Sequence, residues 1–149
     1  NRKSGQRGGK KMTVSKAIIK WLEGFNSEYH SLAKINTDIQ GPKIDTFALI
    51  KEPVKNVKSY VSGKKVCTEH YTFQARLSSG DDLDRIDNLN LGEALEEYVE
   101  SKDRAEEYPD IPGATVKSIG ITTPFCVGVV EDNSSIYQMT IAIKYEKEN

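Results

Sequence analysis

The amino-acid sequence predicts an α+β fold, in which a mainly antiparallel four-stranded sheet carries two helices packed on one face. Two observations support this fold class. Residues 137–145 alternate apolar and polar side chains, which is the period-two pattern of a strand with one buried face. Two other segments repeat apolar residues at helical spacing, and each is followed by two strand-like segments. The resulting order, α-β-β-α-β-β, is typical of helices on one face of an antiparallel sheet.

The first predicted helix begins after Thr13, whose hydroxyl can cap the first turn. Apolar residues then recur at the spacing of one helical face. These residues are Val14, Ile18, Trp21, Leu22 and Phe25. Gly24 and the pair at 26–27 interrupt the pattern, so we expect the helix to end near them.

Two strands are predicted next, separated by a polar segment. Residues 44–50 form the first strand, which we expect to stop at Pro53 because proline cannot donate a backbone hydrogen bond. Residues 66–77 form the second. Its core-facing side chains are Tyr71, Phe73, Ala75 and Leu77. Residues 54–65 between the strands carry several lysines, and are expected to be a loop or the tip of an extended hairpin.

The second predicted helix repeats apolar residues at helical spacing through Leu91, Leu95, Tyr98 and Val99. Asn90 with Glu93 forms a plausible capping box, and Leu83 and Ile86 can begin an earlier turn. A run of acids precedes this segment, at Asp81, Asp82, Asp84 and Asp87. The run lacks the glycine and glutamate of a calcium-binding loop, so negative charge at a helix N-terminus explains it better.

The last two strands cover residues 115–122 and 136–145, and Gly120 suggests a bulge in the former. Residues 124–135 are expected to be a long, partly exposed connection. Phe125, Val127 and Val129 make this connection unusually apolar, which indicates either a buried interface with a partner or a strand that continues into the core. The terminal strand buries Tyr137, Met139, Ile141, Ile143 and Tyr145.

Length and charge indicate one domain with a distinct N-terminal segment. The chain has 149 residues, which suits a single core, and its net charge is −1. Residues 1–11 carry five basic side chains and no acid, so the remaining net charge is −6, obtained from −1 by removing those five positive charges. We therefore expect a basic arm at 1–11 and one domain at 12–149.

Residues 1–11 have three possible origins. They can be a native basic arm that binds nucleic acid or another anionic partner. They can also be a tag, or the translation of a purine-rich ribosome-binding site, because residues 7–12 can be encoded by such a sequence followed by a start codon at Met12. No apolar signal segment lies near the N-terminus, and no run approaches the roughly 20 apolar residues that span a bilayer, so a cytosolic origin is expected.

The sequence predicts no catalytic residues, no metal site and no cofactor. Two cysteines and two histidines equal the ligand count of a zinc site, but Cys67 and His70 are an odd number of residues apart in a predicted strand and so point to opposite faces. No serine lies in a nucleophile elbow, and no glycine-rich phosphate loop occurs. The sequence does not decide whether Cys67 and Cys126 form a disulfide.

Five segments together resemble a protein family. They are KEPVKNVKSYVSGKK at 51–65, FQARL at 73–77, GEAL at 92–95, TPF at 123–125 and SIYQMTIAIKY at 135–145. They resemble the minor capsid proteins of phages and prophages of Gram-positive bacteria, and the resemblance covers nearly the whole chain from Thr13. In size and element order the chain is similar to tail terminators of long-tailed phages.

The resemblance implies a structural protein of the virion that lies at the head–tail junction and is made in the cytoplasm of a bacterial host. Such proteins form a ring, typically a hexamer, that caps the tail tube and docks to the head connector. The implied partners are other copies of the chain, the major tail tube protein and a head-side connector protein. The resemblance brings no catalytic residues with it.

Candidate contacts with these partners lie in two segments. The lysine-bearing segment at 54–65, whose residues 56–65 are predicted to project as an arm, supplies seven candidate contacts: Lys55, Asn56, Val57, Lys58, Tyr60, Lys64 and Lys65. The apolar connection supplies Phe125, Val127 and Val129. The alternative function is a nucleic-acid-binding accessory protein that uses the basic arm and the lysine-rich segment. A hydrolase or transferase with an unrecognised site ranks last.

Overall fold

The computed structural model describes residues 13–25, 35–36 and 46–147. The elements are α1 (Val14–Leu22), β1 (Ile35–Asn36), β2 (Thr46–Ser59), β3 (Lys65–Ser78), α2 (Asp82–Arg104), β4 (Ala114–Val130) and β5 (Ser134–Lys147). The sheet order is β1-β2-β3-β5-β4. Strands β2 to β5 pair antiparallel, which confirms the predicted α+β class and element order. The predicted basic arm at 1–11 lies outside the described residues.

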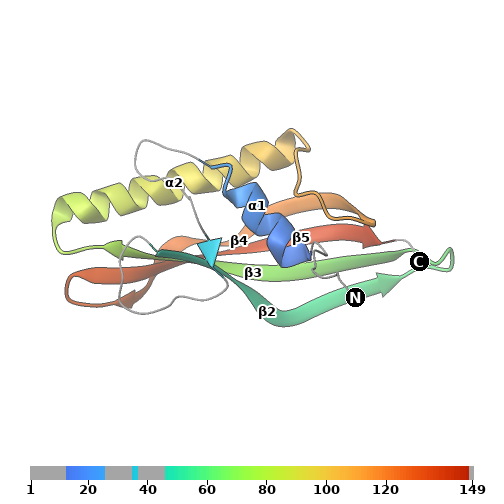
Figure 1. Cartoon of the computed structure of the whole chain (residues 1–149), viewed down its shortest axis with the longest axis horizontal. Coiled ribbons are helices and arrows are strands. Elements are labelled where there is room, and N and C mark those ends of the chain that lie inside the picture. Colours follow the sequence, from blue (N-terminus) through green and yellow to red (C-terminus); the bar gives the residue numbers. More distant parts are fainter. Residues whose placement is uncertain (1–12, 26–34, 37–45, 148–149) are drawn as a thin grey trace, which may run out of the picture.

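Both helices lie on the same side of the sheet (Figure 1), and α2 runs along its length. The core is formed between this helical layer and the sheet. The five predicted positions of β5, from Tyr137 to Tyr145, are all buried, as are the four of β3. A strand that the sequence did not predict, β1, adds a two-residue parallel pairing of Ile35 and Asn36 with Phe47 and Ala48.

Helix α1 begins where the sequence predicts, because the Thr13 hydroxyl accepts a 3.2 Å hydrogen bond from the Lys16 amide. The helix is tied to the C-terminal half of α2 by Tyr98. The Tyr98 hydroxyl donates a 2.6 Å hydrogen bond to the Trp21 carbonyl oxygen, and the two rings pack with centroids 5.4 Å apart. Phe25 packs edge-on against the same Tyr98 ring.

Helix α2 begins earlier than the predicted capping box at Asn90 and Glu93, so that prediction is wrong. The cap is Asp81, whose carboxylate accepts a 2.8 Å hydrogen bond from the Asp84 amide. Asp82 and Asp84 lie in the first turn, where negative charge is stabilised by the helix dipole. The helix therefore starts at Asp82 and continues through Asn90.

Strand β2 does not stop at Pro53, and the prediction that it ends there is also wrong. It continues to Ser59 after a shift in its pairing with β3 between Lys51 and Lys55. Among the described residues, β2 forms the sheet edge beyond its short pairing with β1. An edge strand with a bulge can include a proline, because no neighbouring strand needs its missing N–H.

Residues 124–135 were expected to be a connection, and this expectation is wrong because β4 continues to Val130. A short turn then leads into β5, closed by a 3.0 Å hydrogen bond from the Glu131 amide to the Ser134 carbonyl oxygen. Four register shifts divide β4, and two of them flank Gly120, which itself pairs with Ala142. The extra residues that these bulges absorb explain why the alternation of a strand is hard to recognise in the sequence.

Candidate interaction surfaces

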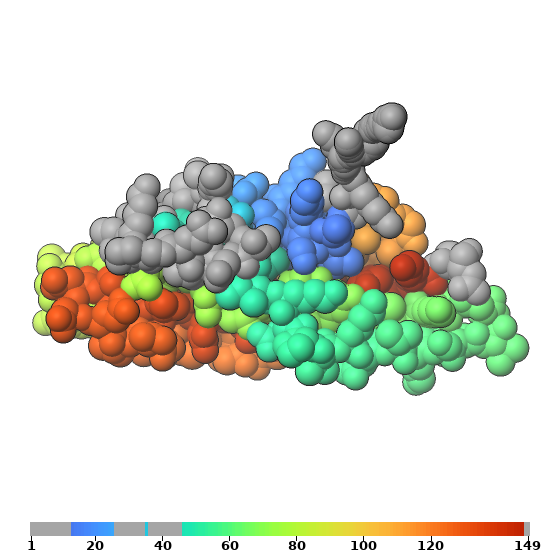
Figure 2. Space-filling view, turned by 60° about the horizontal axis from the view of Figure 1, so that its bottom comes forward, coloured from blue at the N-terminus to red at the C-terminus, as the bar shows by residue number. Residues whose placement is uncertain are grey.

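The first candidate surface is the lysine hairpin, which we define as residues 54–65. Its turn is closed by hydrogen bonds from the Tyr60 amide to the Lys64 carbonyl oxygen (2.9 Å) and from the Gly63 amide to the Tyr60 carbonyl oxygen (3.0 Å). Gly63 has φ of 95°, the left-handed conformation that follows a tight turn in a hairpin. The turn is therefore a defined structure at one end of the molecule (Figure 2).

The lysine hairpin is continuous with the sheet, so of the two alternatives predicted for 54–65 the extended hairpin is confirmed and the loop is wrong. Strand β3 pairs with β5 as far as Lys65 and Lys147, so only the turn extends past the paired strands among the described residues. Apolar side chains are nevertheless exposed along it. Val54, Val57 and Tyr60 are about half exposed, and Val61 at the turn is fully exposed.

Some of the hairpin's positive charge is already paired. Lys55 Nζ lies 3.3 Å from Glu69 Oε2, and Lys64 Nζ lies 3.6 Å from Glu146 Oε1. Lys58 and Lys65 are exposed. Asn56 is also exposed. It pairs with Thr68, and the residues on either side of Thr68, Cys67 and Glu69, are buried on the helix side of the sheet, so Asn56 faces the opposite side.

A buried carboxylate, Glu69, anchors the base of the hairpin. It accepts hydrogen bonds from the Tyr71 hydroxyl (2.7 Å) and the Tyr145 hydroxyl (2.6 Å), and Lys51 Nζ lies 3.7 Å away. Together with Lys55, these groups connect β2, β3 and β5. A buried charge is tolerated only with such partners, so the cluster fixes the position of β2 relative to its neighbours.

The surroundings of Glu69 shift the pKa values of the whole cluster. Burial alone would raise the pKa of Glu69, but the hydrogen bonds from Tyr145 and Tyr71, the charge of Lys51 and the hydrogen bond from Lys55 together outweigh burial and lower it. Burial, followed by the hydrogen bond to the Glu69 carboxylate, raises the pKa of both tyrosines. At neutral pH the cluster is a carboxylate held by two neutral phenols.

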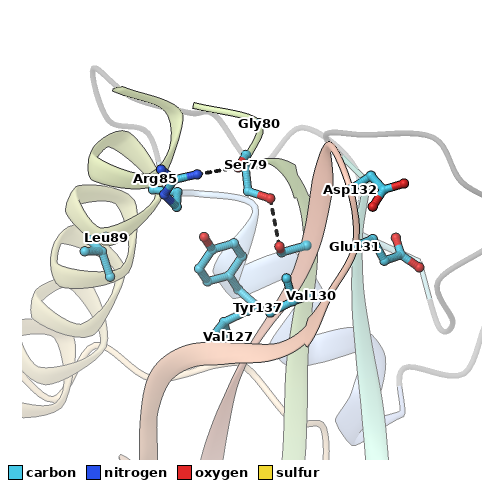
Figure 3. Close-up of a pocket in the computed structure, with 10 residues that line it drawn as sticks. Ser79, Gly80, Arg85, Leu89, Val127, Val130, Glu131, Asp132 and Tyr137 are labelled. Atoms are coloured by element: carbon cyan, nitrogen blue, oxygen red, sulfur yellow. Dashed lines mark hydrogen bonds between the residues drawn. The ribbon is translucent and has the colours of Figure 1, made fainter. Parts of the chain in front are cut away.

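The second candidate surface is a groove between the start of α2 and the β4–β5 hairpin, with a volume of about 380 Å³. We call it the α2–β4 groove. In Figure 3, Arg85 and Leu89 come from α2, and Val127, Val130 and Tyr137 face them from the two strands. Ser79, Gly80, Glu131, Asp132 and Ser135 complete the lining. The centre of the groove is thus apolar and its rim is polar.

Hydrogen bonds between neighbouring elements hold the groove open. The Ser79 and Ser135 hydroxyls lie 2.8 Å apart, and Arg85 donates a 2.9 Å hydrogen bond to the Ser79 carbonyl oxygen (Figure 3). The buried side chain of Asn88 donates to the Ser78 carbonyl oxygen at 2.8 Å and to the Tyr137 hydroxyl at 3.3 Å. The walls are therefore fixed before anything occupies the groove.

Apolar side chains on both walls of the groove are exposed. Ile86 and Leu89, one helical turn apart on α2, are more than half exposed, and 75% of Val130 on β4 is exposed. Large apolar side chains that are exposed together beside a concave site indicate a binding role. Val129 is 49% exposed, nearly the same as Val127 at 47%, but it pairs with Ile136 and faces the other side of the sheet.

Phe125, the third apolar residue that the sequence proposed as a contact, belongs to the core. Its ring stacks on Tyr137 with centroids 5.4 Å apart, and it lies against Gly92 of α2. A Cβ atom at position 92 would come within 2.3 Å of Phe125 Cδ2, so the glycine is what allows this close approach. The structure therefore leaves Val127 and Val129 at the surface and encloses Phe125.

The sequence pointed to the lysine hairpin and to the β4 valines, but not to Glu69 or to the groove. A signal for the Glu69 cluster was present, since Glu69, Tyr71 and Tyr145 all occupy inward positions of strands predicted to be half buried. The groove depends on how far β4 extends. Because the end of β4 was expected to be a loop, its valines could not be placed opposite α2.

No protein-family model matches the chain, and no curated protein matches it in sequence. Within residues 13–25, 35–36 and 46–147, no cluster of three or more His, Cys, Asp or Glu side chains could bind a metal ion. Cys67 is buried, Cys126 is exposed, and both are free thiols. None of the described helices is long and apolar enough to cross a bilayer.

Proposed function

We propose that the chain is a structural protein of a phage virion, a tail terminator that forms a homo-oligomeric ring between the tail tube and the head connector, and that it is not an enzyme. The observation that carries this proposal is the presence of two exposed apolar surfaces at the two ends of one long sheet. The lysine hairpin lies at one end, and the α2–β4 groove lies at the other (Figure 1).

Two separated surfaces suit a subunit that contacts two neighbours. A contact between different patches on identical subunits joins them head to tail, and such a contact forms a closed ring when the rotation between subunits closes. The sequence resemblance to phage minor capsid proteins gives the ring its proposed place in the virion. It also gives its partners, the major tail tube protein and the head-side connector.

Hydrogen bonds in the core make the subunit rigid, as a component of a ring should be. The polar groups of greatest burial, such as Glu69 and Asn88, are used in contacts between elements of the fold. These polar groups therefore connect the strands and the helix to one another. The surfaces that stay available are apolar and charged patches, which are suited to protein contacts.

The proposal is tested by removing the gene from the phage or prophage that encodes the chain and examining the particles by electron microscopy. We expect free heads, together with tails of abnormal length, because an uncapped tube has no defined end. Supplying the wild-type chain from a plasmid should restore joined particles. Normal infectious particles without the chain would refute the proposal.

The alternative, a nucleic-acid-binding accessory protein, relies on the lysine hairpin and on the basic arm at 1–11. Two of the hairpin's four lysines already have carboxylate partners, which leaves less charge for phosphate contacts. Gel-shift measurements at low salt with the full chain and with protein beginning at Met12 distinguish the two functions. Tight binding that weakens steeply with salt would favour the alternative.

A further inference from the structure

The geometry points to one specific contact within the proposed ring: the turn of the lysine hairpin of one copy occupies the α2–β4 groove of the next copy. This inference rests on the proposed function, since it names the surfaces that join the subunits. It commits to a second copy of the chain as the occupant of the groove.

The two surfaces cannot meet within one molecule. Strand β3 begins at Lys65, beside the turn, and ends at Ser78, beside the groove. Its 14 residues span about 45 Å at roughly 3.3 Å per residue. Figure 1 shows the β2–β3 turn and the β4–β5 turn at opposite ends of the sheet, and the groove is lined by residues of the β4–β5 turn. Any contact between the turn of the lysine hairpin and the groove therefore joins two copies.

The shapes of the two surfaces are complementary. The turn presents Val61, which is fully exposed, next to the half-exposed ring of Tyr60. The groove is a concave site of about 380 Å³ with an apolar centre formed by Leu89, Val127 and Val130. This volume is near the lower end of the range of about 300–1,000 Å³ found for ligand pockets, so it suits one or two side chains.

The charges of the two surfaces are opposite. The hairpin carries exposed Lys58 and Lys65, and has no acid between residues 54 and 65. The groove end carries exposed acids on α2 and on the β4–β5 turn. These acids are Asp81, Asp82, Asp87, Glu131 and Asp132. Complementary charge of this kind directs orientation and suppresses wrong pairings.

Bases at the groove end reduce its negative charge without cancelling it. Arg85 pairs with Asp82, and Arg76 pairs with Glu131. Asp81 caps the helix through one oxygen and stays exposed, and Asp132 is exposed at the rim. An approaching lysine therefore meets carboxylates that are still accessible, next to an apolar site for Val61.

Disulfide trapping tests this contact. In a Cys126→Ser background, Val61→Cys combined with Val127→Cys should cross-link under mild oxidation into a ladder of oligomers. The matched control combines Val61→Cys with Val129→Cys, because Val129 is as exposed as Val127 but faces the other side of the sheet. We expect a ladder for the first pair and little product for the control. Equal cross-linking of both pairs would overturn the inference.

A mixing experiment tests whether the contact is head to tail. Val61→Asp damages only the turn, and Val130→Asp damages only the groove. Each variant alone should lose self-association, yet an equal mixture should form a dimer through the one intact turn and the one intact groove. Two variants that both assemble like the wild type would overturn the inference, as would a mixture in which no dimer forms. Circular dichroism confirms that each variant is folded.

The failure of this inference can be distinguished from the failure of the proposed function. If wild-type rings form while the Val61–Val127 pair cross-links no better than its control, only the location of the contact is wrong. If the Val127→Cys chain in particles cross-links to a different polypeptide, the groove belongs to another virion protein and the second copy is excluded as its occupant. If particles without the chain are normal, the proposed function fails irrespective of the cross-linking result.

Discussion

The Tyr145 hydroxyl donates a 2.6 Å hydrogen bond to Oε2 of Glu69 and so joins β5 to β3 beneath the lysine hairpin. The Tyr71 hydroxyl donates to the other oxygen of the same carboxylate. A carboxylate that accepts two phenolic hydrogen bonds in a buried site stabilises the fold only while it is ionised. The sheet at the base of the hairpin therefore depends on one charge.

The first prediction concerns Glu69→Gln. The amide replaces one of the two accepting oxygens with an NH2 donor that faces a tyrosine hydroxyl, and it removes the negative charge beside Lys51 and Lys55. The variant should therefore lose about 1–3 kcal/mol of unfolding free energy, the usual cost of disrupting buried hydrogen bonds. Urea unfolding at pH 7 measures this loss. Glu100→Gln, at an exposed position of α2, is the control and should change stability little. An unchanged unfolding midpoint for Glu69→Gln would contradict the role assigned to the cluster.

The second prediction concerns pH. The pKa of Glu69 is lower in the folded state than its ordinary value of 4.5, so the carboxylate stabilises the fold above that value. This contribution is lost as the pH falls through the folded-state pKa. The wild-type unfolding free energy should therefore drop more steeply than that of Glu69→Gln between neutral and acidic pH. Parallel curves for the two proteins would show that Glu69 does not contribute.

The third prediction concerns Gly92→Ala. Alanine favours a helix over glycine by about 1 kcal/mol, but its Cβ would lie 2.3 Å from the Phe125 ring. Displacing the ring from the core should cost more than this gain, so we expect a net loss of about 1–3 kcal/mol. Gly120→Ala is the control, since nothing lies within 4 Å of its added Cβ.

A second substitution shows whether the clash causes the effect of Gly92→Ala. Phe125→Leu shortens the side chain that the new methyl group meets. The double variant should be less destabilised than the sum of the two single variants, as expected for residues in direct contact. Simple additivity of the two losses would mean that the glycine acts through some other property.

The fourth prediction uses the chain's one tryptophan. Tyr98→Phe removes the hydroxyl that donates to the Trp21 carbonyl oxygen, and should cost about 1 kcal/mol. It should also shift the Trp21 fluorescence, because the two rings are in contact. Tyr60→Phe, at the exposed hairpin, should leave both the fluorescence and the stability unchanged.

The fifth prediction concerns the hairpin turn. Gly63 has φ of 95°, a conformation that costs other residues about 1 kcal/mol or more. Gly63→Ala should therefore speed amide exchange at Tyr60 and at position 63 by about fivefold or more, after correction for the intrinsic exchange rate of alanine, while leaving exchange in β5 unchanged. Ser62→Ala, in the same turn, should retain the wild-type protection. Equal protection in both variants would show that the turn does not need its glycine.

The sequence predicted correctly those elements in which buried and exposed side chains alternate regularly. Alternation in β3 and β5 identified the buried residues from Tyr71 to Leu77 and from Tyr137 to Tyr145, because these strands pair with each other without a register shift. The cap at Thr13 located the start of α1 for a similar local reason.

The elements that the sequence misplaced are those in which local signals compete with tertiary contacts. Pro53 is a strong stop signal, but an edge strand with a shifted register accommodates it. Bulges along β4 break the alternation that would have revealed a strand up to Val130. The α2–β4 groove exists only because that strand continues, so it could not be predicted from sequence periodicity.

The anchoring of β2 through Glu69 has a consequence for how fast the chain can recognise another molecule. A segment that is held by buried hydrogen bonds and a closed turn is preorganised, and its conformational entropy is lost during folding instead of during the encounter. Contacts made by Val61 and Tyr60 would then contribute to affinity without an ordering penalty. Collisions would succeed at rates set by orientation and charge steering, with no preceding rearrangement of the backbone.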